Sequence, residues 1–194
     1  MLDTEPGRPL VLDCGCGTGV STHRLAARHP GAWAIGVDRS AHRLGMDEAP
    51  EDEPTRASEG LVRRSGSVVL VRAEVSSVWA LLQEEARKLE AIYLLYPNPY
   101  PKAAHLKRRW HAHPRFPTLL ALGGTLELRS NWDIYVEEMA KTLSRLGRAV
   151  TRDEVPADEA PLSPFEAKYR RSGHALHRLR VGANAGGRSP GRAG

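Results

Sequence analysis

The sequence lacks the features that mark disulfide-stabilised, membrane-spanning or secreted proteins. Its 194 residues include only two cysteines, Cys14 and Cys16, and cysteines two positions apart are too close for an ordinary disulfide. No run approaches the roughly 18 apolar residues of a transmembrane helix, so no membrane contact is expected. The first residues, MLDTEPGRPLVLD, lack the basic and apolar regions of a secretory signal. We therefore expect a cytoplasmic protein.

Aromatic residues are scarce and charge is unevenly distributed. Aromatics make up 6% of the chain, which argues against a wide base-stacking surface, while 28 Lys and Arg against 23 Asp and Glu permit a polyanionic partner. The length suits one domain, which we place at residues 1–181. Residues 45–60 hold six acids and one Arg, a composition typical of a mobile loop. The Gly- and Arg-rich residues 182–194 are predicted to be a disordered tail.

Apolar runs alternate with amphipathic segments along the chain. Runs that are apolar throughout and separated by helices are typical of a parallel sheet covered on both faces. The sequence therefore predicts an α/β fold with a doubly wound, mostly parallel sheet. The expected strands are 9–15, 33–40, 67–75, 91–101, 125–130, 148–155 and 174–182, and the expected helices are 20–29, 78–90, 114–124 and 132–147.

A glycine-rich loop follows the first expected strand. Gly15, Gly17 and Gly19 form a G-x-G-x-G pattern that lets the backbone approach a ligand at an electropositive helix N-terminus. Asp38 ends the second strand, where an acid can accept from both ribose hydroxyls. Three acids at strand ends suit a cationic nucleoside better than an anionic dinucleotide. We expect Asp13 to face an ammonium group of the ligand, and Glu74, at the end of the third strand, to lie beside an adenine. The predicted cofactor-binding residues are Asp13, Gly15, Gly17, Asp38 and Glu74.

This loop and its acids resemble those of the class I S-adenosylmethionine-dependent methyltransferases. The resemblance implies a Rossmann-like fold and S-adenosylmethionine as the cofactor. The alternative is that Asp13 and Asp38 are ordinary turn-forming residues at strand ends. A C-x-C metal pair is the alternative role for Cys14 and Cys16, but without further cysteines nearby we expect small residues in a tight loop and no metal.

The segment YPNPYPKAAHLKRRWHAHPRF at 96–116 is the most specific in the sequence. Pro97 and Pro99 flank Asn98 and predict a rigid, extended backbone at the sheet edge where open α/β folds bind ligands. The cationic residues that follow are predicted to contact phosphates, although charge runs are more often solvated helix faces. These residues are Lys102, His105, Lys107, Arg108 and Arg109.

The same segment resembles the P-D-P-W-x-K-x-x-H-x-K-R-R signature of bacterial TrmB-type tRNA (guanine-N7)-methyltransferases. Asn131, Trp132 and Tyr135 resemble the T-D-W-x-x-Y motif of that family, and residues 163–166 resemble its T-x-F-E motif. The resemblance implies methyl transfer to guanine N7 in tRNA by a monomer or homodimer. It also implies Asn98 as the catalytic residue and a further cofactor contact, RNA contact along residues 104–109, and substrate contacts at Lys102, Asn131, Ser163 and Glu166.

Two positions depart from the family pattern. Asn98 and Asn131 stand where the family has its proposed catalytic aspartate and its guanosine-contacting aspartate. Guanine N7 is a free lone pair with no proton to remove, so catalysis depends mostly on placing the nucleophile and the methyl group, and Asn98 can still position the base. Asn131 offers only one carbonyl oxygen to the guanine N1–H and N2–H₂ donors. We therefore expect weakened or altered guanine recognition.

Two other functions remain open at the level of sequence. Asn98-Pro99-Tyr100 is one proline short of the N-P-P-Y motif of methyltransferases that act on exocyclic or side-chain amines, in which the Asn oxygen accepts from the amine. A catalytically weakened, RNA-binding relative is the other alternative. The two Asp-to-Asn differences favour it, whereas the retained cofactor acids and glycines oppose it.

Overall fold

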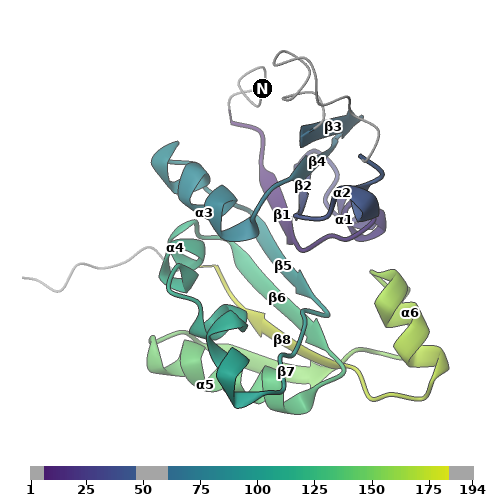
Figure 1. The fold of residues 1–194 in the computed structure, drawn as a ribbon, viewed down its shortest axis with the longest axis vertical. Helices are drawn as coiled ribbons and strands as arrows, with labels where there is room; N and C mark the ends of the chain where they lie inside the picture. Colours follow the sequence, from purple (N-terminus) through teal and green to yellow (C-terminus); the bar gives the residue numbers. More distant parts are fainter. Residues whose placement is uncertain (1–6, 47–60, 184–194) are drawn as a thin grey trace, which may run out of the picture.

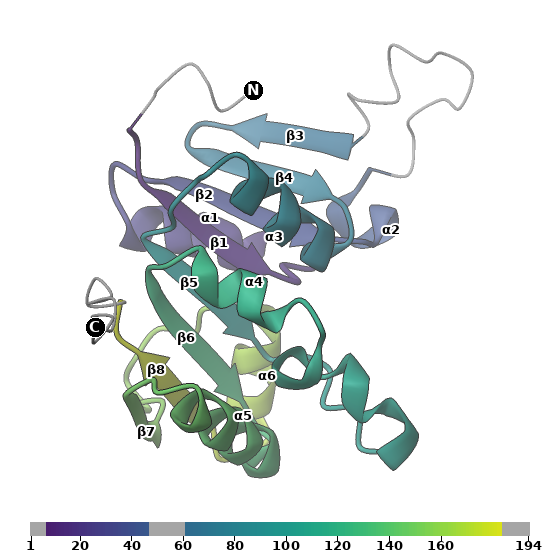
Figure 2. The ribbon, with the colours of Figure 1, turned by 90° about the vertical axis from the view of Figure 1, so that its left-hand side faces the viewer.

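A computed structural model of the protein describes residues 7–46 and 61–183. The acidic segment 45–60 and the tail 182–194 therefore lie almost entirely outside the described residues. The predicted α/β fold is confirmed, with a mixed sheet between two layers of helices (Figures 1 and 2). The strands are β1 (Leu10–Cys14), β2 (Trp33–Asp38), β3 (Val62–Ser65), β4 (Val68–Arg72), β5 (Ala91–Leu95), β6 (Thr125–Ser130), β7 (Val150–Glu154) and β8 (His177–Val181). The α-helices are α1 (Val20–Arg28), α2 (Ala41–Leu44), α3 (Val75–Glu84), α4 (Phe116–Ala121), α5 (Asp133–Arg145) and α6 (Pro164–Arg171), and the 3₁₀ helices are η2 (Ala103–Arg108) and η3 (Trp110–Ala112).

The strand order among the described residues is β3-β4-β2-β1-β5-β6-β8-β7. The central strands β4, β2, β1, β5 and β6 are parallel, whereas β3 and β8 run antiparallel to their neighbours. The chain proceeds from β1 outward through β2 to β4, and then returns to the other side of β1 with β5 and β6. The strand order therefore reverses beside β1, and the carboxyl ends of strands at such a switch point form the ligand site of open α/β folds.

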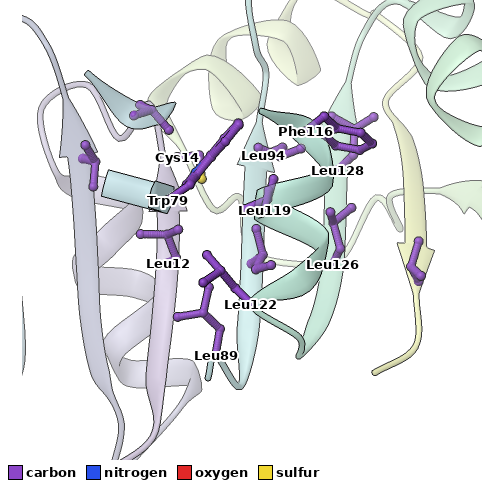
Figure 3. Packing of buried hydrophobic residues seen from close by; sticks show 14 of the residues in the cluster. Leu12, Cys14, Trp79, Leu89, Leu94, Phe116, Leu119, Leu122, Leu126 and Leu128 are labelled. Atoms are coloured by element: carbon purple, nitrogen blue, oxygen red, sulfur yellow. The ribbon is translucent and has the colours of Figure 1, made fainter. Parts of the chain in front are cut away.

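Apolar side chains hold helices on both faces of the sheet. On one face, Trp79 of α3, Leu119 of α4 and Met139 of α5 pack over strand residues that include Leu12 and Leu94 (Figure 3). The opposite face is covered by α1 and α2 (Figure 2), through side chains such as Leu25 and Leu44. Helix α6 lies on the same side as α1. The central strands are thus buried on both faces, which explains why their sequences are apolar throughout rather than alternating.

The expected elements are present, most of them with shorter bounds, whereas the strand predicted at 125–130 has the same bounds in β6. The fourth strand ends at Leu95, six residues before its predicted end, because Tyr96 adopts a left-handed conformation with φ of 52°. Helix α3 begins at Val75, three residues early, because Glu74 caps it by accepting from the backbone N–H of Ser76. The short elements β3 and α2, the helix α6 and the 3₁₀ helices were not predicted.

Candidate active site

Four of the predicted site residues lie at or just beyond the carboxyl ends of the central strands. Asp13 lies on β1, Asp38 is the last residue of β2, Asn98 follows β5 by three residues, and Asn131 directly follows β6. Because these strands are parallel neighbours, their carboxyl ends meet at one edge of the sheet on both sides of the switch point.

The glycine-rich loop needs its glycines for backbone conformation. Gly15 and Gly17 have φ of 81° and 59°, a left-handed region that other residues rarely adopt. No described atom lies within 4 Å of the position that a Cβ would take at either glycine, so this part of the loop is open to a ligand. The loop is fixed to β2, because the N–H groups of Gly15 and Cys16 both donate to the carbonyl of Val37, at 2.8 and 3.1 Å.

Asp13 is a buried carboxylate, and one of its oxygens has no hydrogen-bond partner among the described residues. Its Oδ2 accepts from the hydroxyls of Ser21 (2.6 Å) and Thr22 (2.8 Å) on α1. No described group donates to its buried Oδ1. Burial raises the pKa of Asp13 to about 6, although the two hydroxyl donors act in the opposite direction. A buried oxygen without a donor calls for a bound partner, and a ligand ammonium group fits this requirement.

Asp38 is oriented by the backbone around it. Its Oδ2 accepts from the N–H of Gly17 (3.0 Å), and its Oδ1 accepts from the N–H of Ser40 (2.9 Å). Because each carboxylate oxygen can accept more than one hydrogen bond, the side chain retains capacity for ribose hydroxyls. Glu74, which we expected beside an adenine, is exposed at the N-terminus of α3. The donor and acceptor set thus fits a cationic nucleoside, with Asp13 and Asp38 as its main anchors.

Asn98 is exposed, and its amide has a defined orientation. Its Oδ1 accepts from the backbone N–H of Tyr100 at 3.1 Å, so the NH₂ group of the amide faces away from that contact. Tyr96 and Tyr100, on either side of Asn98, both have positive φ, 52° and 42°. Such conformations cost about 1–3 kcal/mol each and cluster at functional sites.

The basic residues after Asn98 divide into two groups. Lys102, Lys107 and Arg108 are exposed, and His105 is half-buried, so the phosphate contacts of these four residues stay a prediction. Arg109 is different, because only 5% of it is exposed. Its guanidinium pairs with Glu138 on α5 and donates to the carbonyl of Tyr100 at 3.1 Å. Contrary to our expectation for Arg109, the structure uses this cation inside the protein.

Ser163 and Glu166 also take internal roles rather than the expected substrate contacts. Ser163 is buried and caps α6, accepting from the N–H of Glu166 at 3.1 Å. Glu166 is completely buried, and its Oε1 lies 2.9 Å from a guanidinium nitrogen of Arg129 on β6. These contacts anchor α6 to the sheet. The fourth expected substrate residue, Asn131, stays half-buried at the edge, where its amide lies 3.3 Å from Nδ1 of His174.

Sequence reasoning missed an aromatic group beside Asn131. The ring centroid of Tyr169, on α6, lies 5.7 Å from the ring centroid of Tyr96 and 5.4 Å from that of His174. Phe165, half exposed, stacks on Tyr169 at 6.3 Å. The sequence did contain one sign of this group, the i, i+4 spacing of Phe165 and Tyr169. That spacing places the two rings on one face only if residues 164–171 form a helix, and this helix was not predicted.

Cys14 and Cys16 are free, buried thiols, and burial raises the pKa of Cys14 to about 12. Within residues 7–46 and 61–183, no group of three or more His, Cys, Asp or Glu could hold a metal ion. No helix in those same ranges is long and apolar enough to span a bilayer.

The arrangement of strand-end acids, glycine loop and basic segment can be compared with known proteins. A family model described as "Putative methyltransferase" matches residues 7–179. The chain belongs to this methyltransferase family. A relative named tRNA (guanine-N(7)-)-methyltransferase, from Alkalilimnicola ehrlichii, is 30% identical over 188 residues and covers 92% of this chain and 75% of the relative. A protein of the same name from Neisseria meningitidis serogroup B is 28% identical, covering 87% of this chain and 69% of that protein.

Solved structures show the same fold as this methyltransferase. An antibiotic-related methyltransferase has a TM-score of 0.59 at 18% identity and covers 91% of this chain and 88% of that one. A 16S rRNA (adenine(1408)-N(1))-methyltransferase from Catenulisporales acidiphilia, solved with its cosubstrate S-adenosylmethionine, has a TM-score of 0.57 at 20% identity, covering 95% and 89%. At these identities the likeness concerns the fold, which is that of the class I methyltransferases.

Proposed function

We propose that this methyltransferase uses S-adenosylmethionine to methylate N7 of a guanine in tRNA. The observation that carries the proposal is the position of the basic segment. Lys102, Lys107 and Arg108 follow directly from the Asn98 loop, at the sheet edge where Asp13 and Asp38 stand. Curated relatives with this named activity match 87–92% of the chain, which supports the same assignment.

The cofactor would be held by residues of both strand ends and the glycine loop. The open Oδ1 of Asp13 would accept from the ammonium group of S-adenosylmethionine, and Asp38 from the ribose hydroxyls, while Gly15 and Gly17 let the backbone approach. The sulfonium of the cofactor supplies the activated methyl group. No proton has to leave guanine N7, so the protein's own task is to orient the base and exclude misaligned approaches.

Asn98 is suited to orient guanine by donation. Its Oδ1 is already engaged by the Tyr100 N–H, which leaves the amide NH₂ to donate to the base. The N7 edge of guanine carries two acceptors, N7 and O6, and donation to O6 would leave N7 facing the methyl group. An exocyclic amine would instead need an acceptor from Asn98. The orientation of this amide therefore favours guanine N7 over the amino-group alternative.

Unmodified tRNA incubated with the protein and isotope-labelled S-adenosylmethionine tests this function. Nucleoside mass spectrometry should detect labelled N7-methylguanosine. Asn98→Ala should lower kcat about 10–100-fold, because it removes one orienting hydrogen bond made to the reacting base. Lys141→Ala, on the exposed face of α5, is the matched control. Label in an exocyclic amine, or cofactor binding without transfer, would contradict the proposal.

The exposed basic residues should set the salt dependence of tRNA binding. Each phosphate contact releases counterions, so Lys102→Ala combined with Lys107→Ala should reduce the slope of log affinity against log salt by about 2. The loss in affinity should be similar for tRNAs of different sequence, because phosphates carry no sequence information. Filter binding at several salt concentrations measures both effects, again with Lys141→Ala as the control. An unchanged slope would place the RNA elsewhere.

A further inference from the structure

The buried Arg109 connects α5 to the loop that carries Asn98. One terminal nitrogen of its guanidinium pairs with Oε2 of Glu138, and the other donates to the carbonyl of Tyr100 at 3.1 Å. Its Nε finds no acceptor among the described residues. The guanidinium therefore links two elements, because one terminal nitrogen contacts a residue of α5 and the other contacts the backbone of the loop.

The backbone N–H and the backbone carbonyl of Tyr100 are both hydrogen-bonded to side chains. Its carbonyl accepts from Arg109, and its N–H donates to Oδ1 of Asn98 at 3.1 Å. With φ of 42°, Tyr100 has a backbone conformation that a residue with a side chain adopts only when its surroundings enforce it. The contact with Arg109 is thus one of the interactions that fix the direction of the Asn98 amide.

The attachment to α5 is reinforced next to Arg109. The same Oε2 of Glu138 lies 3.3 Å from Nε2 of His111, and the hydroxyl of Tyr135 accepts from the N–H of Trp110 at 3.1 Å. Tyr135 is a residue of α5 itself and is buried. Because α5 packs against the sheet, it is a rigid support for the segment 109–111, in contrast to the exposed Lys107 and Arg108 that precede it.

We infer that Arg109 and Glu138 are positioning residues for methyl transfer, which act on the base through Tyr100 and Asn98, and that neither contacts RNA. The inference depends on the proposed function, since it concerns the geometry of that reaction. It assigns different roles to two nearby cations. The exposed Lys107 serves RNA affinity, whereas Arg109 serves the rate of the bound complex. A lysine cannot replace Arg109, because one ammonium nitrogen cannot bridge the carboxylate and the carbonyl in the fixed geometry of a guanidinium.

Steady-state kinetics with varied tRNA and saturating S-adenosylmethionine test the two roles. Arg109→Ala, Arg109→Lys and Glu138→Ala should each lower kcat by about tenfold or more with the KM for tRNA within about twofold of wild type. Glu138→Gln, which keeps an acceptor oxygen, should recover much of the rate. Lys107→Ala should show the opposite pattern, a raised KM with kcat retained. Because the two residues act as a unit, the double variant of Arg109→Ala and Glu138→Ala should be no slower than the worse single variant.

Hydrogen exchange provides a readout that does not depend on turnover. The amide of Tyr100 should exchange slowly in the wild type, faster in Arg109→Lys, and at a rate between these two in Glu138→Gln, which keeps an acceptor for Arg109. Both are mild changes that keep the test possible if Arg109→Ala fails to fold. A raised KM with unchanged kcat in Arg109→Lys, or Tyr100 exchange in that variant equal to the wild type, would overturn the inference. If the wild type transfers no methyl group to tRNA, the proposed function fails, and the exchange of Tyr100 still decides whether Arg109 and Glu138 hold this loop.

Discussion

Arg129→Met is expected to lower the free energy of unfolding by about 3–5 kcal/mol, the usual consequence of removing one partner of a buried ion pair. Arg129 is completely buried on β6, and its guanidinium nitrogens reach Glu127, Glu159 and Glu166. Glu166 is completely buried as well. Without Arg129, the only cation that the described residues place near this carboxylate is Arg170, at 3.5 Å, so the charge of Glu166 would be left poorly compensated.

Urea denaturation followed by circular dichroism measures this loss. Combining Arg129→Met with Glu166→Leu should recover most of the stability, because the pair is then replaced by apolar side chains. Arg152→Ala is the matched control. It breaks an exposed pair with Asp133 and should change stability by less than about 1 kcal/mol. A single Arg129→Met variant within about 1 kcal/mol of wild type would mean that water or rearrangement compensates Glu166.

The same ion pair has a consequence for the site. It connects β6, whose end carries Asn131, to α6, which carries Tyr169 (Figure 1). Loss of the pair should therefore loosen the aromatic group beside Asn131 before the rest of the molecule. This explains how a residue of the T-x-F-E-like motif, Glu166, can matter for activity without contacting the substrate.

The sequence predicts the central part of the fold well because burial leaves a clear signal there. Strands such as Trp33–Asp38 are buried at every position, and a parallel sheet covered on both faces requires this. The positions of Asp13, Asp38 and Asn98 follow from the same logic, since they stand at or just beyond strand ends. In contrast, β3 has the sequence VRRS and is mostly exposed, so neither its composition nor its period distinguishes it from a loop.

The roles of individual charges could not be predicted, because they depend on partners distant in the sequence. Arg109 lies in a run of basic residues that is otherwise exposed, and its burial follows from Glu138, 29 positions away. Glu166 is likewise paired with Arg129, 37 positions away. A charge pattern shows how many cations a segment carries. Only the packing shows which of them are used internally.

We expect the affinity for the cofactor to rise with pH, because Asp13 ionises within the range of the measurement. Burial raises its pKa to about 6, above the value near 4 of an unfolded carboxyl. The folded protein therefore holds this proton more tightly, and the group's contribution to stability is present below about pH 4 and is lost as pH rises through 6. Folding is more favourable when Asp13 is protonated, whereas binding of a cation at its Oδ1 is more favourable when Asp13 is ionised.

Affinity for S-adenosylmethionine should therefore increase about tenfold between pH 5 and pH 7, as Asp13 changes from mostly protonated to mostly ionised. Isothermal titration calorimetry across this range measures the change, and Asp13→Asn should bind weakly and without this pH dependence. Asp158→Asn, an exposed carboxyl between β7 and α6, should retain it. If Asp13→Asn kept the full tenfold increase, another group would be titrating. Each oxygen of Asp38 already has a backbone N–H donor, whereas Oδ1 of Asp13 has none among the described residues, so the charge of Asp13 is the one that the ammonium group of the cofactor would compensate.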